Sequence, residues 1–302
     1  MRYRERVTVI EVGMRDGIQI EPRFIPTAQK IALANLITDA GVQVQEVTSF
    51  VHPRAVPQLA DAAEVVAGIR RSPGVRFGAL VPNLRGAGRA VSAGIDEIRY
   101  VVMSTETFNQ KNVQMSVRES LAQLPALREL CRTGTRPVRL IGSLGTSFGC
   151  PYEGDVPERR VLDLVAEFVA AGVDGITLAD TTGMANPVQV VRLVSALRER
   201  WPDLEVVLHF HNTRGMGLAN VLAGMEAGVT IFEASIGGLG GCPFAPRATG
   251  NICTEDTVHM LHAMGIETGI DLEALIEAAR TIQDTLGHEL PGQVMKAGPV
   301  RR

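Results

Sequence analysis

Short apolar runs rich in β-branched residues alternate along the chain with longer segments whose apolar residues recur at helical spacing. The short runs predict strands, because β-branched side chains pack well on a pleated, buried surface. They lie at 7–13, 44–50, 76–81, 97–102, 138–143, 175–179, 206–210 and 231–236. The pattern therefore predicts an alternation of strands and helices over most of the chain.

The intervening segments predict helices with one apolar face. Thr27, directly after Pro26, is a candidate N-cap for the first helix. Further helices are expected at 60–71, 84–93, 116–132, 187–200, 217–227, 254–264 and 271–286. Two segments repeat apolar residues at i, i+3, i+4 and i+7, which predicts a buried stripe on each: Leu33, Leu36, Ile37 and Ala40, then Val161, Leu164, Val165 and Phe168.

A three-residue motif of alanine, glycine and a β-branched residue ends several helical segments just before a strand. It occurs at 40–42, 93–95, 171–173 and 227–229. Glycine takes the left-handed position after a helix without a steric penalty, and the apolar residue after it packs back on the helix. The motif indicates repeated αβ units, and their number fits a (β/α)8 barrel. A doubly wound sheet is the second choice.

We see no linker and expect a single domain over 1–302, with the barrel at about 7–240, a glycine-rich lid loop at 237–250 and an added helical part at about 254–290. With 302 residues, 45% of them hydrophobic and 21% charged, the chain has the composition of an ordinary globular protein. The net charge of −3, without runs of like charge, gives no support for nucleic-acid or membrane binding.

No apolar run approaches the roughly 18 residues that span a bilayer, and the basic start of the chain is too short for a signal peptide. We therefore expect a cytoplasmic protein. Disulfides are not expected there, because the four cysteines are widely spaced and none lies in a Cys-x-x-Cys pair: Cys131, Cys150, Cys242 and Cys253.

Polar residues follow several predicted strands, at the barrel end where catalytic residues belong. His209 and His211 are two apart at a strand end, so their imidazoles point to one side. They suit two ligands of one metal, with Asp16 adding a carboxylate oxygen and Asn251 a carbonyl oxygen. This donor set fits Mg²⁺ or Mn²⁺ and also admits Zn²⁺ or Fe²⁺. Cys253 is a rival ligand, although a small buried side chain is its more ordinary role.

Two further features could carry chemistry at this site. A guanidinium at Arg15, beside Asp16, could stabilise an oxyanion that develops on a substrate carbonyl, and Glu46 could hold Arg15 in place. Cys242 lies on a loop with four glycines in five positions, 237–241. Such a loop can close over a ligand and bring a thiol to it.

Several motifs together resemble the 3-hydroxy-3-methylglutaryl-CoA lyase family of the DRE-TIM metallolyases. They are EVGMRDGIQ at 11–19, EVTSFV at 46–51, VPQ at 56–58, PNL at 82–84, GCPYEG at 149–154, HFH at 209–211 and the glycine-rich stretch 237–251. The resemblance implies a TIM barrel and a divalent metal, Mg²⁺ or Mn²⁺, held by Asp16, His209, His211 and Asn251.

The resemblance also implies roles for individual residues. Cys242 would be the catalytic cysteine that protonates an acetyl-CoA enolate, and Arg15 would stabilise that enolate. Glu46 and Asp180 would be supporting catalytic residues, and either His209 or Asp16 could be the base that takes the hydroxyl proton.

Departures from the family pattern lie around the substrate. An arginine and a tyrosine of the family are replaced by Ile141 and Ser143, a tyrosine after the His-x-His motif by Arg214, and a glycine by Ala179. We therefore expect Gln19, Ser143 and Arg214 to contact a 3-hydroxy-acyl-CoA that could be larger than 3-hydroxy-3-methylglutaryl-CoA or differently charged.

Two other functions fit parts of the pattern. A Claisen-type synthase, of the isopropylmalate or homocitrate synthase kind, shares the Arg-Asp and His-x-His elements. A non-enzymatic sensor of acyl-CoA or metal would not need both Arg15 and Cys242. By resemblance, the assembly is expected to be a homodimer.

Overall fold

The computed structural model describes residues 3–134, 136–241 and 250–300. Its parallel strands close into a barrel in the order β1 to β8, because β1 pairs with β2 on one side and with β8 on the other. The strands are β1 Thr8–Glu11, β2 Val44–Ser49, β3 Arg76–Val81, β4 Glu97–Met103, β5 Arg139–Gly145, β6 Gly175–Asp180, β7 Val206–Phe210 and β8 Ile231–Ala234.

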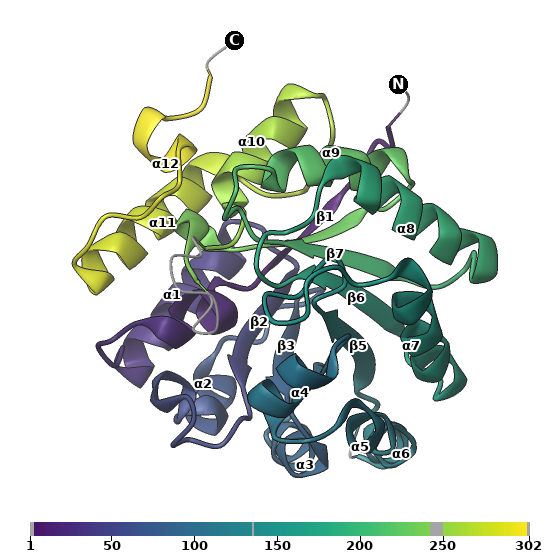
Figure 1. Ribbon diagram of the computed structural model, residues 1–302. Helices are drawn as coiled ribbons and strands as arrows, with labels where there is room; N and C mark the ends of the chain where they lie inside the picture. Colours follow the sequence, from purple (N-terminus) through teal and green to yellow (C-terminus); the bar gives the residue numbers. More distant parts are fainter. Residues whose placement is uncertain (1–2, 135, 242–249, 301–302) are drawn as a thin grey trace.

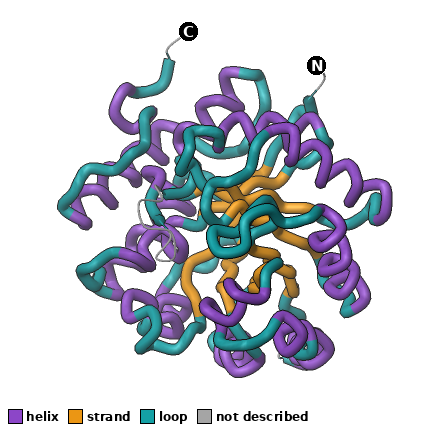
Figure 2. The backbone as a smooth tube through the Cα atoms, viewed as in Figure 1, coloured by secondary structure: helices purple, strands orange, loops and turns teal. Residues whose placement is uncertain are grey.

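Helices form an outer ring around these strands (Figure 1), and Figure 2 shows the strands gathered at the centre of that ring. The helices are α1 Thr27–Asp39, α2 Ala62–Gly68, α3 Leu84–Ser92, α4 Glu106–Val113, α5 Val117–Leu121, α6 Leu124–Thr133, α7 Glu158–Ala170, α8 Pro187–Arg200, α9 Gly217–Glu226, α10 Thr254–Ala263, α11 Leu272–Leu286 and α12 Val294–Ala297. Short helical turns are η1 Gly13–Gly17, η2 Ile18–Ile20, η3 Pro57–Leu59 and η4 Ile236–Gly238. The predicted (β/α)8 barrel is confirmed, and the doubly wound sheet is wrong because the sheet has closed on itself.

The helix-ending motif behaves as its chemistry predicts. Gly41, Gly94, Gly172 and Gly228 all have positive φ, between 76° and 91°. The next residue bonds back to the helix: the N–H of Val42 donates to the carbonyl of Ile37 at 3.4 Å, and that of Val229 to Gly224 at 2.9 Å. Each of these units thus turns from helix to strand across four residues.

Three local predictions were wrong. Thr27 is the first helical residue rather than the N-cap, and its hydroxyl donates to Asp61 at 2.8 Å. Leu36, expected in the buried stripe, is 40% exposed. The single helix expected over 116–132 is two helices, α5 and α6, and α6 has Pro125 in its first turn, where a ring without an N–H is tolerated. Helix α4 was not expected at all.

The interior of the barrel is divided along its axis. The outer faces of the strands and the helices share one large hydrophobic core. Inside, Val44 and Val207, near the amino-terminal ends of β2 and β7, form a small apolar cluster with Ile10 and Val12. Another cluster, with Val101, Met103, Phe108 and Cys150, lies beside the opposite end. In the described part of the chain, none of the helices is both long enough and apolar enough to cross a bilayer.

Candidate metal centre and active site

Asp16 is brought to the mouth of the barrel by a tight turn after β1. The amides of Arg15, Asp16 and Gly17 all point at the carbonyl of Val12, at 3.0, 2.8 and 3.4 Å. The turn η1 can pack this closely because Gly17 has no side chain: a Cβ there would lie 2.8 Å from the side chains of Leu239 and Ser235. Asp16 is left only 6% exposed.

His209 and His211 reach the same place from the end of β7. Among the described residues, Asp16, His209 and His211 form a cluster whose potential ligand atoms all lie within 4.8 Å of one another. The Oδ2 atom of Asp16 is 4.0 Å from Nε2 of His209 and 3.6 Å from Nε2 of His211. The cluster is buried and has the size of a site for one metal ion.

The charges of the cluster suit metal binding. Burial by itself would raise the pKa of Asp16, but Arg15 and the two imidazoles outweigh it and hold the pKa well below its usual range. Burial, with help from His211, lowers the pKa of His209 to about 3. A carboxylate that stays ionised and an imidazole that stays neutral are the forms in which these groups bind metals.

Asn251 provides an independent test of the fit. Its Nδ2 atom donates to Oδ2 of Asp16 at 2.7 Å and to the carbonyl of Leu239 at 3.0 Å. Its Oδ1 atom is buried without a hydrogen-bond partner in the described part of the chain. A buried oxygen left without a partner beside two imidazoles and a carboxylate is what an added cation would satisfy.

The glycine-rich stretch shapes this corner of the site. Gly237 and Gly238 are buried in the left-handed region, with φ of 64° and 70°. Gly240 allows the closest approach, because a Cβ there would lie 2.6 Å from Nδ2 of Asn251. Gly240 therefore packs directly against the site, whereas Gly237 and Gly238 pack against Leu290 and Pro291. Cys242 and the rest of the predicted lid, 242–249, lie outside the described residues.

Arg15 and Gln19 surround Asp16 with donors. Arg15 donates through Nη1 to Oδ1 of Asp16 at 2.5 Å and through Nη2 to Oε2 of Glu46 at 2.8 Å. Gln19 donates through Nε2 to the same Oδ1 atom at 2.8 Å. Glu46 lies where the register of β2 and β3 shifts, a local irregularity that changes the direction of the side chains. Arg15 is thus fixed beside the cluster by two carboxylates.

The remaining predicted site residues lie around the same mouth. Asp180, at the end of β6, accepts through Oδ1 from the amides of Met184 and Ala185 at 2.7 and 3.1 Å, while its Oδ2 atom has no partner among the residues described. Burial, opposed by those amides, raises the pKa of Asp180 to about 6. Arg214 donates through Nη1 to the carbonyls of Thr182 and Gly183 at 3.0 and 2.8 Å, so it is tied to the loop after β6.

Ser143 belongs to a less polar side of the mouth. It pairs in register with Val101 on β4. Val101 is two residues from Arg99, so both residues lie on the face of β4 that points into the barrel, and Ser143 lies on the corresponding face of β5. Met103 lies against Gly145, where a Cβ would collide with its sulfur. This side of the mouth is therefore lined by small and apolar groups.

Cys253, the rival ligand, is occupied elsewhere. Its thiol donates to Oε2 of Glu255 at 2.9 Å, and burial raises its pKa well above the usual value. The thiolate that a metal requires is therefore disfavoured.

Sequence reasoning missed Glu233 on β8 and Arg99 on β4. Oε2 of Glu233 is 2.9 Å from Nδ1 of His209, and Arg99 donates to the other oxygen of Glu233. A charged residue within an otherwise buried strand is the signal that could have found them, because such charges are almost never fully buried unless paired.

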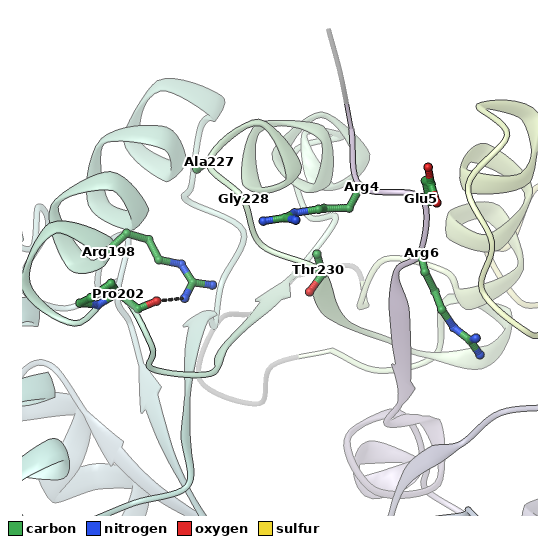
Figure 3. A pocket seen from close by; sticks show the side chains of 8 residues that line it. All are labelled: Arg4, Glu5, Arg6, Arg198, Pro202, Ala227, Gly228 and Thr230. Atoms are coloured by element: carbon green, nitrogen blue, oxygen red, sulfur yellow. Dashed lines mark hydrogen bonds between the residues drawn. The ribbon is translucent and has the colours of Figure 1, made fainter.

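A cavity of about 650 Å³ lies at the other end of the barrel, near the amino-terminal ends of the strands (Figure 3). Arg4 and Arg198 extend into it from opposite sides, and Arg198 donates to the carbonyl of Pro202 at 3.3 Å. Because Thr230 in its lining directly precedes β8, the cavity is separated from the metal cluster by the length of the strand.

A closed parallel barrel with a buried Asp-His-His cluster at the carboxyl ends of its strands defines a (β/α)8 enzyme with a candidate metal site. The chain belongs to the HMGL-like family, whose model matches residues 6–282.

Its relatives are carbon–carbon lyases, and so is this enzyme. A hydroxymethylglutaryl-CoA lyase of Bacillus subtilis is 44% identical over 293 residues, which cover 97% of each chain. An (R)-citramalyl-CoA lyase of Chloroflexus aurantiacus is 41% identical over 306 residues, with 98% of this chain and 96% of the relative covered. The structure of an HMG-CoA lyase from Acinetobacter baumannii in complex with coenzyme A and 3-methylmalate has a TM-score of 0.94 and 47% identity, and the match covers 99% of this chain and 97% of that one.

Proposed function

We propose that the enzyme cleaves 3-hydroxy-3-methylglutaryl-CoA, or a close 3-hydroxy-acyl-CoA analogue, to acetyl-CoA and a keto acid in a metal-dependent reaction. The observation that carries the proposal is the fixed position of Arg15, whose guanidinium bridges Asp16 and Glu46 beside the metal cluster. A sensor would need the ligands but not a cation held beside them to meet developing negative charge.

Asp16, His209, His211 and Asn251 would hold the metal. One carboxylate, two imidazoles and an amide oxygen leave positions for substrate oxygens, and we propose Mg²⁺ or Mn²⁺. When bound, such an ion supplies Lewis-acid polarisation of the substrate oxygens it touches.

The protein's own groups would divide the remaining work. As the C2–C3 bond breaks, its electron pair moves toward the thioester carbonyl, and the guanidinium of Arg15 stabilises the oxyanion that results. The proton of the 3-hydroxyl leaves to a base while C3 becomes a ketone. We propose Asp180 as that base in place of His209 or Asp16, which would hold the metal, because its Oδ2 atom has no partner among the described residues and its pKa is about 6. We propose, from the family resemblance, that Cys242 then donates a proton to C2.

A second substrate deserves the same test. One relative is named as an (R)-citramalyl-CoA lyase. We propose that the small Ser143, on the same side of the mouth as Val101 and Met103, would accommodate different substituents at C3. Cleavage of (R)-citramalyl-CoA would give acetyl-CoA and pyruvate. Gln19 and the second Nη group of Arg214 are the proposed polar contacts to either acyl group.

The experiment is a product assay on the purified protein with Mn²⁺ or Mg²⁺. Each acyl-CoA is supplied separately, and acetyl-CoA is measured together with acetoacetate or pyruvate. We expect metal-dependent acetyl-CoA formation, and the second product identifies the preferred substrate.

Variants separate catalysis from binding. Arg15→Met should lower kcat by about 10²-fold or more, the usual effect of losing one oxyanion donor. Cys242→Ala should lose turnover and keep metal binding, whereas Cys131→Ala, on the distant helix α6, serves as the matched cysteine control. Absence of acetyl-CoA from both substrates with the metal-loaded protein would refute the proposed function.

A further inference from the structure

Below the metal cluster, the barrel interior contains a line of paired charges. Nδ1 of His209 lies 2.9 Å from Oε2 of Glu233, which is 3% exposed. Arg99 crosses the barrel from β4 and donates through Nη1 to Oε1 of Glu233. The hydroxyl of Thr177 also donates to that oxygen, at 3.3 Å. Glu233 is therefore held on one oxygen by donors and presents the other to His209.

Arg99 is itself held from the amino-terminal side of the barrel. Its Nη2 atom donates to Glu97 at 2.8 Å, and Arg139 donates to the other oxygen of Glu97 at 3.1 Å. Arg139 also reaches Glu205 at 2.8 Å. Burying ions costs desolvation energy even when they are paired, so a core of the same shape could be built from apolar residues. The charges must therefore be explained by something other than packing.

Tautomer choice provides that explanation. A neutral imidazole has one N–H and one lone pair, and the group that bonds to one nitrogen decides which atom carries the proton. An ionised carboxylate only accepts hydrogen bonds, so Glu233 requires the proton of His209 on Nδ1. The lone pair then lies on Nε2, the atom that faces Asp16. Nδ1 of His211, by contrast, has no partner among the described residues.

We propose that Glu233, fixed by Arg99, is a positioning residue that sets the tautomer and orientation of His209 for metal binding. This inference rests on the metal site of the proposed function. It explains the interior charges, because Arg99 pairs with the carboxylate of Glu233 and prevents its side chain from turning away from His209.

The substitution Glu233→Gln gives a sharp test because Arg99 can only donate hydrogen bonds. The new amide would turn its oxygen toward Arg99 and its NH₂ group toward His209. Nδ1 would then have to accept, which moves the proton to Nε2 and removes the lone pair that faces Asp16. The variant preserves shape and volume, and Glu205→Gln is the matched control, since it breaks the far end of the same line of charges and leaves Glu233 in place.

The first readout is the tautomer of His209 in metal-free protein, measured by long-range ¹H–¹⁵N NMR of ¹⁵N-histidine-labelled samples. We expect the Nδ1–H form in the wild type and in Glu205→Gln, and the Nε2–H form in Glu233→Gln. The second readout is Mn²⁺ affinity by titration calorimetry. It should fall about 10- to 100-fold in Glu233→Gln, as is typical when the partner of a metal-ligating histidine is lost, and stay unchanged in Glu205→Gln.

An Nε2–H tautomer in the wild type overturns the inference, and this measurement requires no variant to fold. Retention of both the Nδ1–H form and the Mn²⁺ affinity in Glu233→Gln also overturns it. The tautomer does not depend on any substrate, so failure of the lyase assay and failure of this inference are distinguishable.

Discussion

Glu11 is the best place to test how a buried carboxyl group limits the stability of this barrel, because it lies at the end of β1 without a cationic partner among the described residues. Oε1 accepts from the amides of Gly13 at 2.6 Å and Ile236 at 2.9 Å, and Oε2 accepts from the hydroxyl of Thr254 at 2.6 Å. These bonds join the turn that carries Asp16 to the turn η4, which follows β8, and to the helix α10. Burial nevertheless dominates and raises the pKa of Glu11 to about 8.

The consequence for stability has a definite sign. The folded protein holds the proton of Glu11 more tightly than the unfolded chain, where the pKa is near 4.5, so stability falls as pH rises from the unfolded to the folded value. Between pH 6 and pH 9, linkage with these two pKa values removes about 3 kcal/mol of unfolding free energy. Glu11→Gln has nothing to titrate, and its amide can donate to Thr254, since a hydroxyl can also accept. We expect the variant to become more stable, relative to the wild type, by about 3 kcal/mol over this range.

The assay is urea unfolding of both proteins at pH 6 and pH 9, followed by circular dichroism. Glu255, whose pKa burial raises to about 7, titrates in the same range but is present in both proteins. Glu129→Gln, at an exposed site on α6, is the control and should show no pH-dependent gain. A constant free-energy difference between Glu11→Gln and the wild type at the two pH values would refute the reasoning.

Other expectations concern an ion pair, a close approach, the metal and a base. Lys30→Met should cost about 3–5 kcal/mol by leaving Asp61 buried without its cation at 2.7 Å, and adding Asp61→Leu should restore most of that; urea unfolding checks both. Gly240→Ala should weaken Mn²⁺ binding in calorimetry, because its Cβ would lie 2.6 Å from Nδ2 of Asn251 at φ 117°; unchanged affinity would contradict this. Treatment with a chelator should abolish acetyl-CoA formation, and added Mn²⁺ or Mg²⁺ should restore it. The rate should fall as pH drops through about 6, the pKa of Asp180, because a base must be unprotonated; a flat profile from pH 5 to 7 would exclude that role.

The sequence by itself determined the order of the strands and of most helices. This information is local: β-branched runs and helical periodicity depend on neighbouring residues, and the alanine–glycine motif encodes its own left-handed turn. Once the alternation predicted a barrel, the rule that loops at the carboxyl ends of the strands meet was enough to bring Asp16, at the start of the chain, next to His209 and His211.

Only the tertiary structure decided which charges meet inside the barrel. Arg99 and Glu233 are 134 residues apart, and their pairing depends on the stagger of the strands and on which face of each strand points inward. The same holds for Glu11, whose partners include Ile236 and Thr254 in distant segments. Local patterns specify which residues form an element. The partner of a buried ion is specified by the closure of the whole sheet, because desolvation leaves such an ion stable only where the fold brings a complementary group to it.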